Sequence, residues 1–287
     1  MLYGQSIGNC VNVVKRTFSS MADRRQKNFS GAIRRGELVL FYQPKVDMST
    51  GEAIGVEALL RWKHPKLGLL SPAMFIQAMH VDYDGVINIG RWAIQQAVRQ
   101  ISEWAKMGLS LPISVNVLAS ELADDNFCAW LHGVFSKNPD VNPSMLELEV
   151  VESSSIGDIQ TIMQVFKACQ EMGVKVALDD FGTGYSSLSH IRNLNADHVK
   201  IDQSFVKNLH LNHQDRGLVR IVIQLAYNFD CKVIAEGVES VNHGLILMRM
   251  GCRYAQGYVI AKPMPASEMQ RWISQYQGFP EWAGDPL

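Results

Sequence analysis

The chain has 287 residues, of which 47% are hydrophobic and 19% are charged. It can therefore bury a large core, and this composition excludes a disordered or collagen-like protein. With 27 Lys and Arg against 28 Asp and Glu, the net charge is −1, which argues against a protein that coats nucleic acid or an anionic membrane through bulk charge.

Short apolar runs alternate along the chain with longer amphipathic stretches. Residues 1–21 are weakly patterned and indicate a lead-in or linker, and residues 22–35 predict a short helix that ends before Gly36. Eight runs rich in Val, Ile, Leu and Tyr follow, and such runs are typical of strands buried on both faces. They span residues 38–46, 53–62, 112–117, 145–150, 174–180, 198–202, 232–237 and 252–258.

Helical periodicity fills most of the intervals between these runs. Residues 87–107, 158–173 and 216–229 are the clearest cases, and we expect their apolar stripes to face the core. In the last of them, the predicted stripe consists of Leu218, Ile221, Val222 and Leu225.

Strands that alternate with helices predict a (β/α)8 TIM-like barrel in one domain, residues 22–287. The first two runs depart from this rhythm, because only a short segment around Gly51 separates them. A parallel crossover needs about a dozen residues. We therefore expect these two strands to form an antiparallel hairpin, which makes the start of the barrel irregular.

Cysteine usage and hydropathy indicate the cellular environment. The five cysteines are odd in number and lack C-x-x-C spacing, which favours reduced, buried thiols over disulfides or a thiolate zinc site. No apolar run approaches the ~18 residues of a membrane helix, and the N-terminus lacks a signal-peptide core. We expect a cytoplasmic protein that does not insert into the membrane, or the cytoplasmic module of a larger sensor.

Polar and acidic side chains stand at the ends of successive predicted strands. They are Glu57, Asn116, Glu149, Glu152, Asp179, Asp180, Lys200, Asp202, Glu236, Glu239 and Gln256. Strand ends in such a barrel converge on one face, so these side chains are expected to share a pocket. Neighbouring carboxylates raise one another's pKa, and divalent cations relieve this repulsion. Oxygen ligands without His or Cys favour Mg²⁺ or Mn²⁺ over Zn²⁺.

The adjacent carboxylates Asp179 and Asp180 are the most informative detail. Consecutive side chains in a strand point to opposite faces, but these two run directly into the loop FGTGYSS, whose glycines permit positive φ. Both side chains can then turn toward one ligand. A carboxylate that bridges two metals about 3.5–4 Å apart recurs in phosphoester hydrolysis, so the pair indicates a two-metal site.

Seven motifs follow one another in a specific order over residues 27–276. They are YQPKVDMSTGEAIGVEALLRW, SVNV, LELEVVES, ALDDFGTGYSSL, VKIDQSFV, VIAEGVE and AQGYVIAKPMP. Together they resemble the EAL family of cyclic di-GMP phosphodiesterases, with Glu57, Ala58 and Leu59 as the signature. The resemblance implies a modified barrel with an antiparallel first strand. It also implies hydrolysis of cyclic di-GMP to linear pGpG by two-metal activation of water, with Mg²⁺ or Mn²⁺ as cofactors and Ca²⁺ as an inhibitor.

The resemblance, carried over position by position, implies three sets of site residues. The metal ligands are Glu57, Asn116, Glu149, Asp179, Asp180 and Glu236. The catalytic residues are Glu57, Glu152, Lys200, Asp202 and Glu236. In this assignment Lys200 contacts the attacking water, and Glu152 anchors the loop after the fifth strand. The residues that touch the dinucleotide are Gln43, Leu59, Arg61, Asp180, Glu239 and Gln256.

Two other functions remain open on the sequence. A catalytically silent EAL receptor would bind cyclic di-GMP and signal through a partner, although such members usually lack a metal ligand and this sequence keeps them all. An unrelated Mg²⁺-dependent barrel, such as an enolase-type lyase with a Lys base, fits the adjacent carboxylates and the motif order less well. The resemblance also implies a homodimer that pairs near the loop after the fifth strand. The balanced net charge predicts no DNA or RNA polymer as partner.

Overall fold

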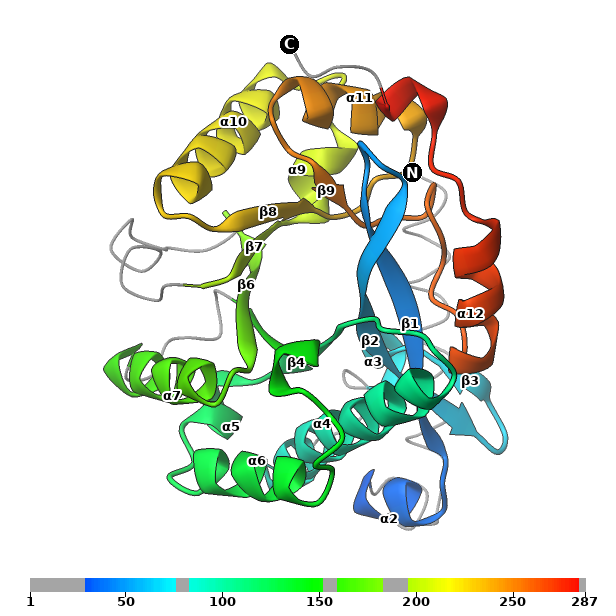
Figure 1. Cartoon of the computed structure of the whole chain (residues 1–287), viewed down its shortest axis with the longest axis vertical. Coiled ribbons are helices and arrows are strands. Elements are labelled where there is room, and N and C mark those ends of the chain that lie inside the picture. Colours follow the sequence, from blue (N-terminus) through cyan, green and yellow to red (C-terminus); the bar gives the residue numbers. More distant parts are fainter. Residues whose placement is uncertain (1–28, 76–82, 152–158, 183–195, 284–287) are drawn as a thin grey trace.

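The computed structural model describes residues 29–75, 83–151, 159–182 and 196–283. Within them, the strands form a closed barrel, and Figure 1 shows helices around its outside. The predicted lead-in, residues 1–21, lies outside the described ranges. The strands are β1 (Leu38–Asp47), β2 (Glu52–His64), β3 (Gly68–Leu70), β4 (Ile113–Val117), β5 (Leu146–Val151), β6 (Lys175–Phe181), β7 (His198–Ile201), β8 (Lys232–Ala235) and β9 (Tyr254–Ala255).

The barrel closes because β1 pairs with both β2 and β9. The order around it is β1-β2-β4-β5-β6-β7-β8-β9, and β3 is added to β2 as an antiparallel strand. β1 is antiparallel to both of its neighbours, whereas the pairings from β2 through β9 are parallel. The predicted modified barrel with an antiparallel first strand is therefore confirmed.

The turn between β1 and β2 follows from local chemistry. Gly51 has a φ of 73°, which residues other than glycine rarely adopt. The Asp47 carboxylate accepts hydrogen bonds from the main-chain N–H and the hydroxyl of Ser49, an arrangement that favours a tight turn. The predicted hairpin thus forms, with its tip at the end of the barrel opposite the carboxyl ends of the parallel strands.

Helices cover the barrel and connect its parallel strands (Figure 1). They are α2 (Phe29–Arg34), α3 (Pro72–Phe75), α4 (Tyr83–Lys106), α5 (Ala119–Leu122), α6 (Phe127–Ser136), α7 (Ile159–Glu171), α9 (Gln203–Lys207), α10 (His213–Asn228), α11 (Val241–Arg249) and α12 (Ala266–Gln275), with short 3-10 helices at Pro143–Met145 and Pro280–Trp282. None of the helices in the described ranges combines the length and the apolar character needed to cross a membrane.

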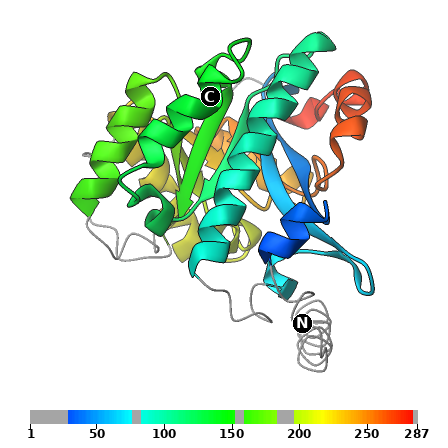
Figure 2. The ribbon, with the colours of Figure 1, turned by 90° about the horizontal axis from the view of Figure 1, so that it is seen from below.

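A second, smaller cluster of buried side chains lies beside the main core. Ala32 of α2 packs there with Leu38, Trp62, Leu70 and Phe75, all of them buried. This cluster joins α2 to the β2–β3 hairpin, and Figure 2 shows both at the same end of the molecule as the start of α4. Of the helix predicted over residues 22–35, the described residues show α2, which ends at Arg34 before Gly36, and residues 22–28 lie outside the described ranges.

Three details differ from the sequence predictions. The predicted stripe of α10 is partly wrong, because Leu218 and Ile221 are 46% and 60% exposed. The buried face of α10 consists of Val219, Val222, Ile223 and Ala226. Apolar residues occupy more than one face of this helix, so periodicity alone selects the wrong row. The last strand, β9, is much shorter than predicted, and the short β3 was not predicted.

Candidate active site

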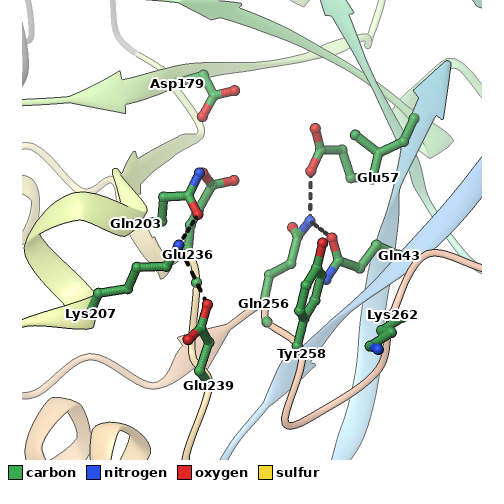
Figure 3. A pocket seen from close by; sticks show the side chains of 13 residues that line it. Gln43, Glu57, Asp179, Gln203, Lys207, Glu236, Glu239, Gln256, Tyr258 and Lys262 are labelled. Carbon is green, nitrogen blue, oxygen red and sulfur yellow. Dashed lines mark hydrogen bonds and ion pairs between the residues drawn. The ribbon is translucent and has the colours of Figure 1, made fainter. Parts of the chain in front are cut away.

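A cavity of about 1010 Å³ opens at the carboxyl ends of the parallel strands. Figure 3 shows two groups of its side chains facing each other, with Asp179, Glu236 and Lys207 on one side and Glu57 and Gln256 on the other. The residues that line it are Gln43, Glu57, Leu59, Asp179, Gln203, Lys207, Glu236, Gly237, Glu239, Gln256, Gly257, Tyr258 and Lys262.

A buried lysine stands at the centre of the acidic residues. The Nζ atom of Lys200 lies 2.7 Å from Glu149 Oε2 and 2.7 Å from Glu236 Oε1. It also lies 3.1 Å from Asp179 Oδ1 and 3.7 Å from Glu57 Oε2. Burial alone would lower the pKa of Lys200, but the surrounding carboxylates raise it well above its usual value. One ammonium group thus faces four carboxylates, which leaves an excess of negative charge.

This crowding shifts the pKa values of the carboxyl groups in different directions. Burial raises the pKa of Glu236 to about 8; Asp179 and Glu57 add to the rise, and Lys200 opposes it. Burial also raises the pKa of Glu57. For Glu149, burial is outweighed by the positive charges of Lys200 and Lys45, so its pKa is lowered. Added positive charge would therefore stabilise the ionised forms of Glu57 and Glu236 more than that of Glu149.

A local irregularity in β6 allows the side chains of Asp179 and Asp180 to lie in the same group of acidic ligands. The β6–β7 pairing shifts register between Leu178 and Phe181, and Asp180 adopts a φ of 53°, in the left-handed region. Its main-chain N–H donates to Asp179 Oδ1 at 2.8 Å. Burial, Asp179 and Asp202 together raise the pKa of Asp180 to about 6.

Two groups of acidic ligand atoms result, and they share Asp179. One group consists of Glu57, Glu149 and Asp179, and the other of Asp179, Asp180 and Glu236. Within each group the ligand atoms lie within 4.8 Å of one another. All of them are carboxylate oxygens, the donor type that Mg²⁺ and Mn²⁺ prefer. The donor set therefore fits a pair of hard divalent cations.

Two amide side chains, Asn116 and Gln256, hold Glu57 in place. Asn116 Nδ2 donates to Glu57 Oε1 at 2.7 Å, and Gln256 Nε2 donates to Glu57 Oε2 at 2.6 Å. Gln256 Nε2 also donates to Gln43 Oε1 at 3.0 Å, while Gln43 Nε2 donates to the main-chain carbonyl of Ala261. The Oε1 atom of Gln256 is buried without a hydrogen-bond partner among the described residues, so it can accept one from a ligand.

The other predicted residues occupy distinct places. Leu59 and Glu239 line the cavity. Asp202 caps α9 by accepting from the Ser204 N–H. Arg61 is not among the lining residues; its guanidinium lies over the Phe41 ring, 5.9 Å from the centroid.

Glu152 lies outside the described residues. Its predicted role at the loop after β6, the fifth of the predicted strands, therefore stays a prediction. The same holds for the homodimer expected near that loop, because residues 183–195 are outside the described ranges as well.

Six lining residues were missed from the sequence: Gly237, Gly257 and four with larger side chains, namely Gln203, Lys207, Tyr258 and Lys262. Lys207 Nζ donates to Gln203 Oε1 at 2.9 Å and lies 3.4 Å from Glu239 Oε1 (Figure 3). Lys262 lies over the Tyr258 ring, 5.8 Å from the centroid. The only sequence signal for these four larger side chains is their position, since Gln203 and Lys207 follow Asp202 and Tyr258 and Lys262 follow Gln256 within a few residues.

Comparison with known proteins assigns the family. Residues 26–263 match the EAL domain. The chain is 37% identical over 251 residues to the cyclic di-GMP phosphodiesterase PdeR of Escherichia coli (strain K12), an alignment that covers 87% of this chain and 37% of that protein. It is 37% identical over 235 residues to the cyclic di-GMP phosphodiesterase PA2567 of Pseudomonas aeruginosa, covering 82% and 40%. The chain thus spans about two fifths of the length of these relatives.

Solved structures agree with this assignment. The PaMucR phosphodiesterase in complex with c-di-GMP matches with a TM-score of 0.78 at 36% identity, over 84% of this chain and 97% of that one. The EAL domain of Mycobacterium smegmatis DcpA matches with a TM-score of 0.71 at 35% identity, over 84% and 98%. The extent of the match, its identity and the shared barrel lead to one conclusion: the chain belongs to the EAL domain family.

Proposed function

We propose that this chain hydrolyses cyclic di-GMP to linear pGpG with the help of two Mg²⁺ or Mn²⁺ ions. The observation that carries the proposal is the pair of acidic groups that share Asp179 around a buried lysine. Their position in a cavity large enough for a dinucleotide supports it. The similarity of the chain to two cyclic di-GMP phosphodiesterases supports it as well.

The acidic groups would hold the metals. Glu57, Glu149 and Asp179 would hold one ion together with Asn116, and Asp179, Asp180 and Glu236 would hold the other. Bound there, the ions would lower the pKa of a water molecule and neutralise charge on the scissile phosphate.

The remaining side chains would bind the dinucleotide and orient the attacking water. Lys200 donates to the carboxylates of Glu149, Glu236 and Asp179. With metals bound to these carboxylates, one N–H of its ammonium group would become available to orient the attacking water. Gln256 fixes Glu57 and also donates to Gln43, and both glutamines line the cavity where the substrate would bind. Leu59, Tyr258 and the other lining residues exclude bulk water from the dinucleotide.

A turnover assay tests this proposal. Purified protein with Mg²⁺ or Mn²⁺ should convert cyclic di-GMP to pGpG, as measured by chromatography, whereas cyclic di-AMP should remain intact and a chelator should stop the reaction. The variants Glu57→Gln and Asp180→Asn should lose turnover by orders of magnitude. The matched control Glu52→Gln, at an exposed carboxylate of the same strand as Glu57, should retain it. Binding of cyclic di-GMP without turnover would instead establish a silent receptor.

The oligomeric state requires its own measurement. The family resemblance implies a homodimer, and light scattering of the purified chain at several concentrations tests it. A monomer at all concentrations would refute the expected pairing without affecting the proposed reaction.

A further inference from the structure

A layer of polar side chains lies inside the barrel directly beneath the acidic cluster. It consists of Lys45 from β1, Ser114 from β4, Glu147 from β5 and His198 from β7, and the first three are buried. Interior layers of such barrels are normally filled by branched apolar residues. Burying an ion pair in place of apolar side chains does little for stability or lowers it. Stability alone therefore does not account for this layer.

The contacts of Lys45 use its whole ammonium group. Its Nζ atom lies 2.9 Å from Ser114 Oγ, 2.7 Å from Glu147 Oε2 and 3.2 Å from Glu149 Oε1. The other carboxylate oxygen of Glu147 pairs with His198 Nδ1. Three acceptors match the three N–H donors of a lysine, so the ammonium group is fixed in position.

Glu149 is consequently held from both sides. Lys45 contacts its Oε1 atom and Lys200 contacts its Oε2 atom, which fixes the rotation of the carboxylate. Glu147 and Glu149 are two residues apart on β5 and so point to the same face. The charge of Lys45 is balanced by Glu147, and the pair therefore adds no net charge beneath the cluster.

The backbone makes room for this lysine. A Cβ atom at Gly55 would lie 3.1 Å from the Pro112 carbonyl oxygen and 3.6 Å from Cε of Lys45. The pairing of β1 with β2 also shifts register between Lys45 and Val46. A larger residue at position 55 would therefore press on the neighbouring strand and on the lysine stem.

We propose that Lys45 is a positioning residue that orients Glu149 for metal binding from the layer beneath the cavity. This inference rests on the proposed function, because it assigns Glu149 as a metal ligand. The competing role is a purely structural one, in which Lys45 serves only as the counter-ion of Glu147.

Three variants separate these roles. Lys45→Met removes the ammonium group that Glu147 and Glu149 share. Glu149 keeps Lys200, but Glu147 loses the charge that balances it, and the variant can fail to fold for that reason alone. The double variant Lys45→Met/Glu147→Gln removes both charges, so it distinguishes the positioning role from the counter-ion role. Glu147→Gln alone is the matched control, because it leaves the contact between Lys45 and Glu149 in place. Circular dichroism melting shows whether each variant folds.

The first measurement is Mn²⁺ affinity, by calorimetric titration without substrate. Partners that orient metal ligands typically contribute about 10–100-fold to metal affinity or activity. The double variant should therefore bind Mn²⁺ at least about tenfold more weakly than the wild-type protein, while Glu147→Gln stays close to the wild type. Equal or tighter Mn²⁺ binding by a folded double variant would overturn the proposal and leave Lys45 as a counter-ion.

The second measurement is the split between kcat and KM at a fixed Mn²⁺ concentration. A loss of kcat in the double variant with little change in the KM for cyclic di-GMP supports the positioning role, because Lys45 does not line the cavity. If the wild-type protein binds Mn²⁺ but does not hydrolyse cyclic di-GMP, the proposed function fails. The Mn²⁺ comparison still decides the role of Lys45 in that case.

Discussion

The carboxyl group of Glu121 provides a quantitative test of the structure away from the cavity. Glu121 lies in α5 with 0% exposure, and neither of its carboxylate oxygens receives a hydrogen bond from a side chain in the described ranges. It lies tightly against α4, since a Cβ atom at Gly90 would be 2.0 Å from Glu121 Oε2. Arg91 is nearby, but its guanidinium donates to Asp124 at 2.6 Å. The charged form of Glu121 is thus poorly compensated.

The magnitude follows from its pKa. Burial raises the pKa of Glu121 from 4.5 to about 7, although the Leu118 main chain and Arg91 act in the opposite direction. At about 1.4 kcal/mol per pKa unit, this rise corresponds to about 3 kcal/mol. The unfolded chain loses the proton near pH 4.5 and the folded chain near pH 7. The free energy of unfolding therefore falls as the pH rises through this window and stays low above it.

The perturbation is Glu121→Gln, which resembles the protonated side chain and cannot ionise. Urea denaturation followed by circular dichroism measures the free energy of unfolding at pH 5 and pH 8. We expect near-equal stability at pH 5 and a variant that is more stable than the wild type by up to about 3 kcal/mol at pH 8. The control Glu103→Gln, at an exposed position of α4, should match the wild type at both pH values. A Glu121→Gln effect that is the same at both pH values refutes the reasoning.

Three further predictions concern the cavity and its walls. Lys200→Met should lower kcat far more than the affinity for cyclic di-GMP, measured by turnover and by calorimetry; equal losses would contradict its role at the water. Gly257→Ala should destabilise the fold by about 1–3 kcal/mol in urea denaturation, because its Cβ would lie 2.1 Å from the Val238 carbonyl oxygen. Gly133→Ala, with nothing within 4 Å, is its control and should not destabilise. Lys207→Met should raise KM several-fold in low salt at unchanged kcat, and added salt should diminish this effect. A KM equal to that of the wild type would exclude Lys207 from substrate binding.

Much of the fold could be predicted because its strands are continuous apolar runs. The run HVKID formed a strand that ends just before Asp202, and the run KVIAEG formed one that ends just before Glu236. The pairing of β2 with β3 could not be predicted, because Lys63, His64 and Lys66 obscure the strand pattern there. The buried face of α10 was also beyond the sequence, since tertiary packing chooses among its apolar rows.

The site shows a similar division. The adjacency of Asp179 and Asp180 predicted that both would face one ligand region, but the positive φ of Asp180 that allows it is a property of the folded strand. The layer of Lys45 and Glu147 was missed, because charged residues in a strand usually face solvent. A signal was nevertheless present, since Glu147 and Glu149 alternate with apolar residues and must share a face.

The reversed direction of β1 has a consequence for how the polypeptide enters the barrel. In a regular barrel the first strand begins at the end opposite the catalytic face, and anything attached before it joins that distant end. Here Leu38, at the start of β1, pairs with Trp62 near the carboxyl end of β2, so α2 joins the barrel at the rim that carries the cavity. The helix α2 is therefore attached at the same end of the barrel as the acidic cluster, and the length of the barrel does not separate the two.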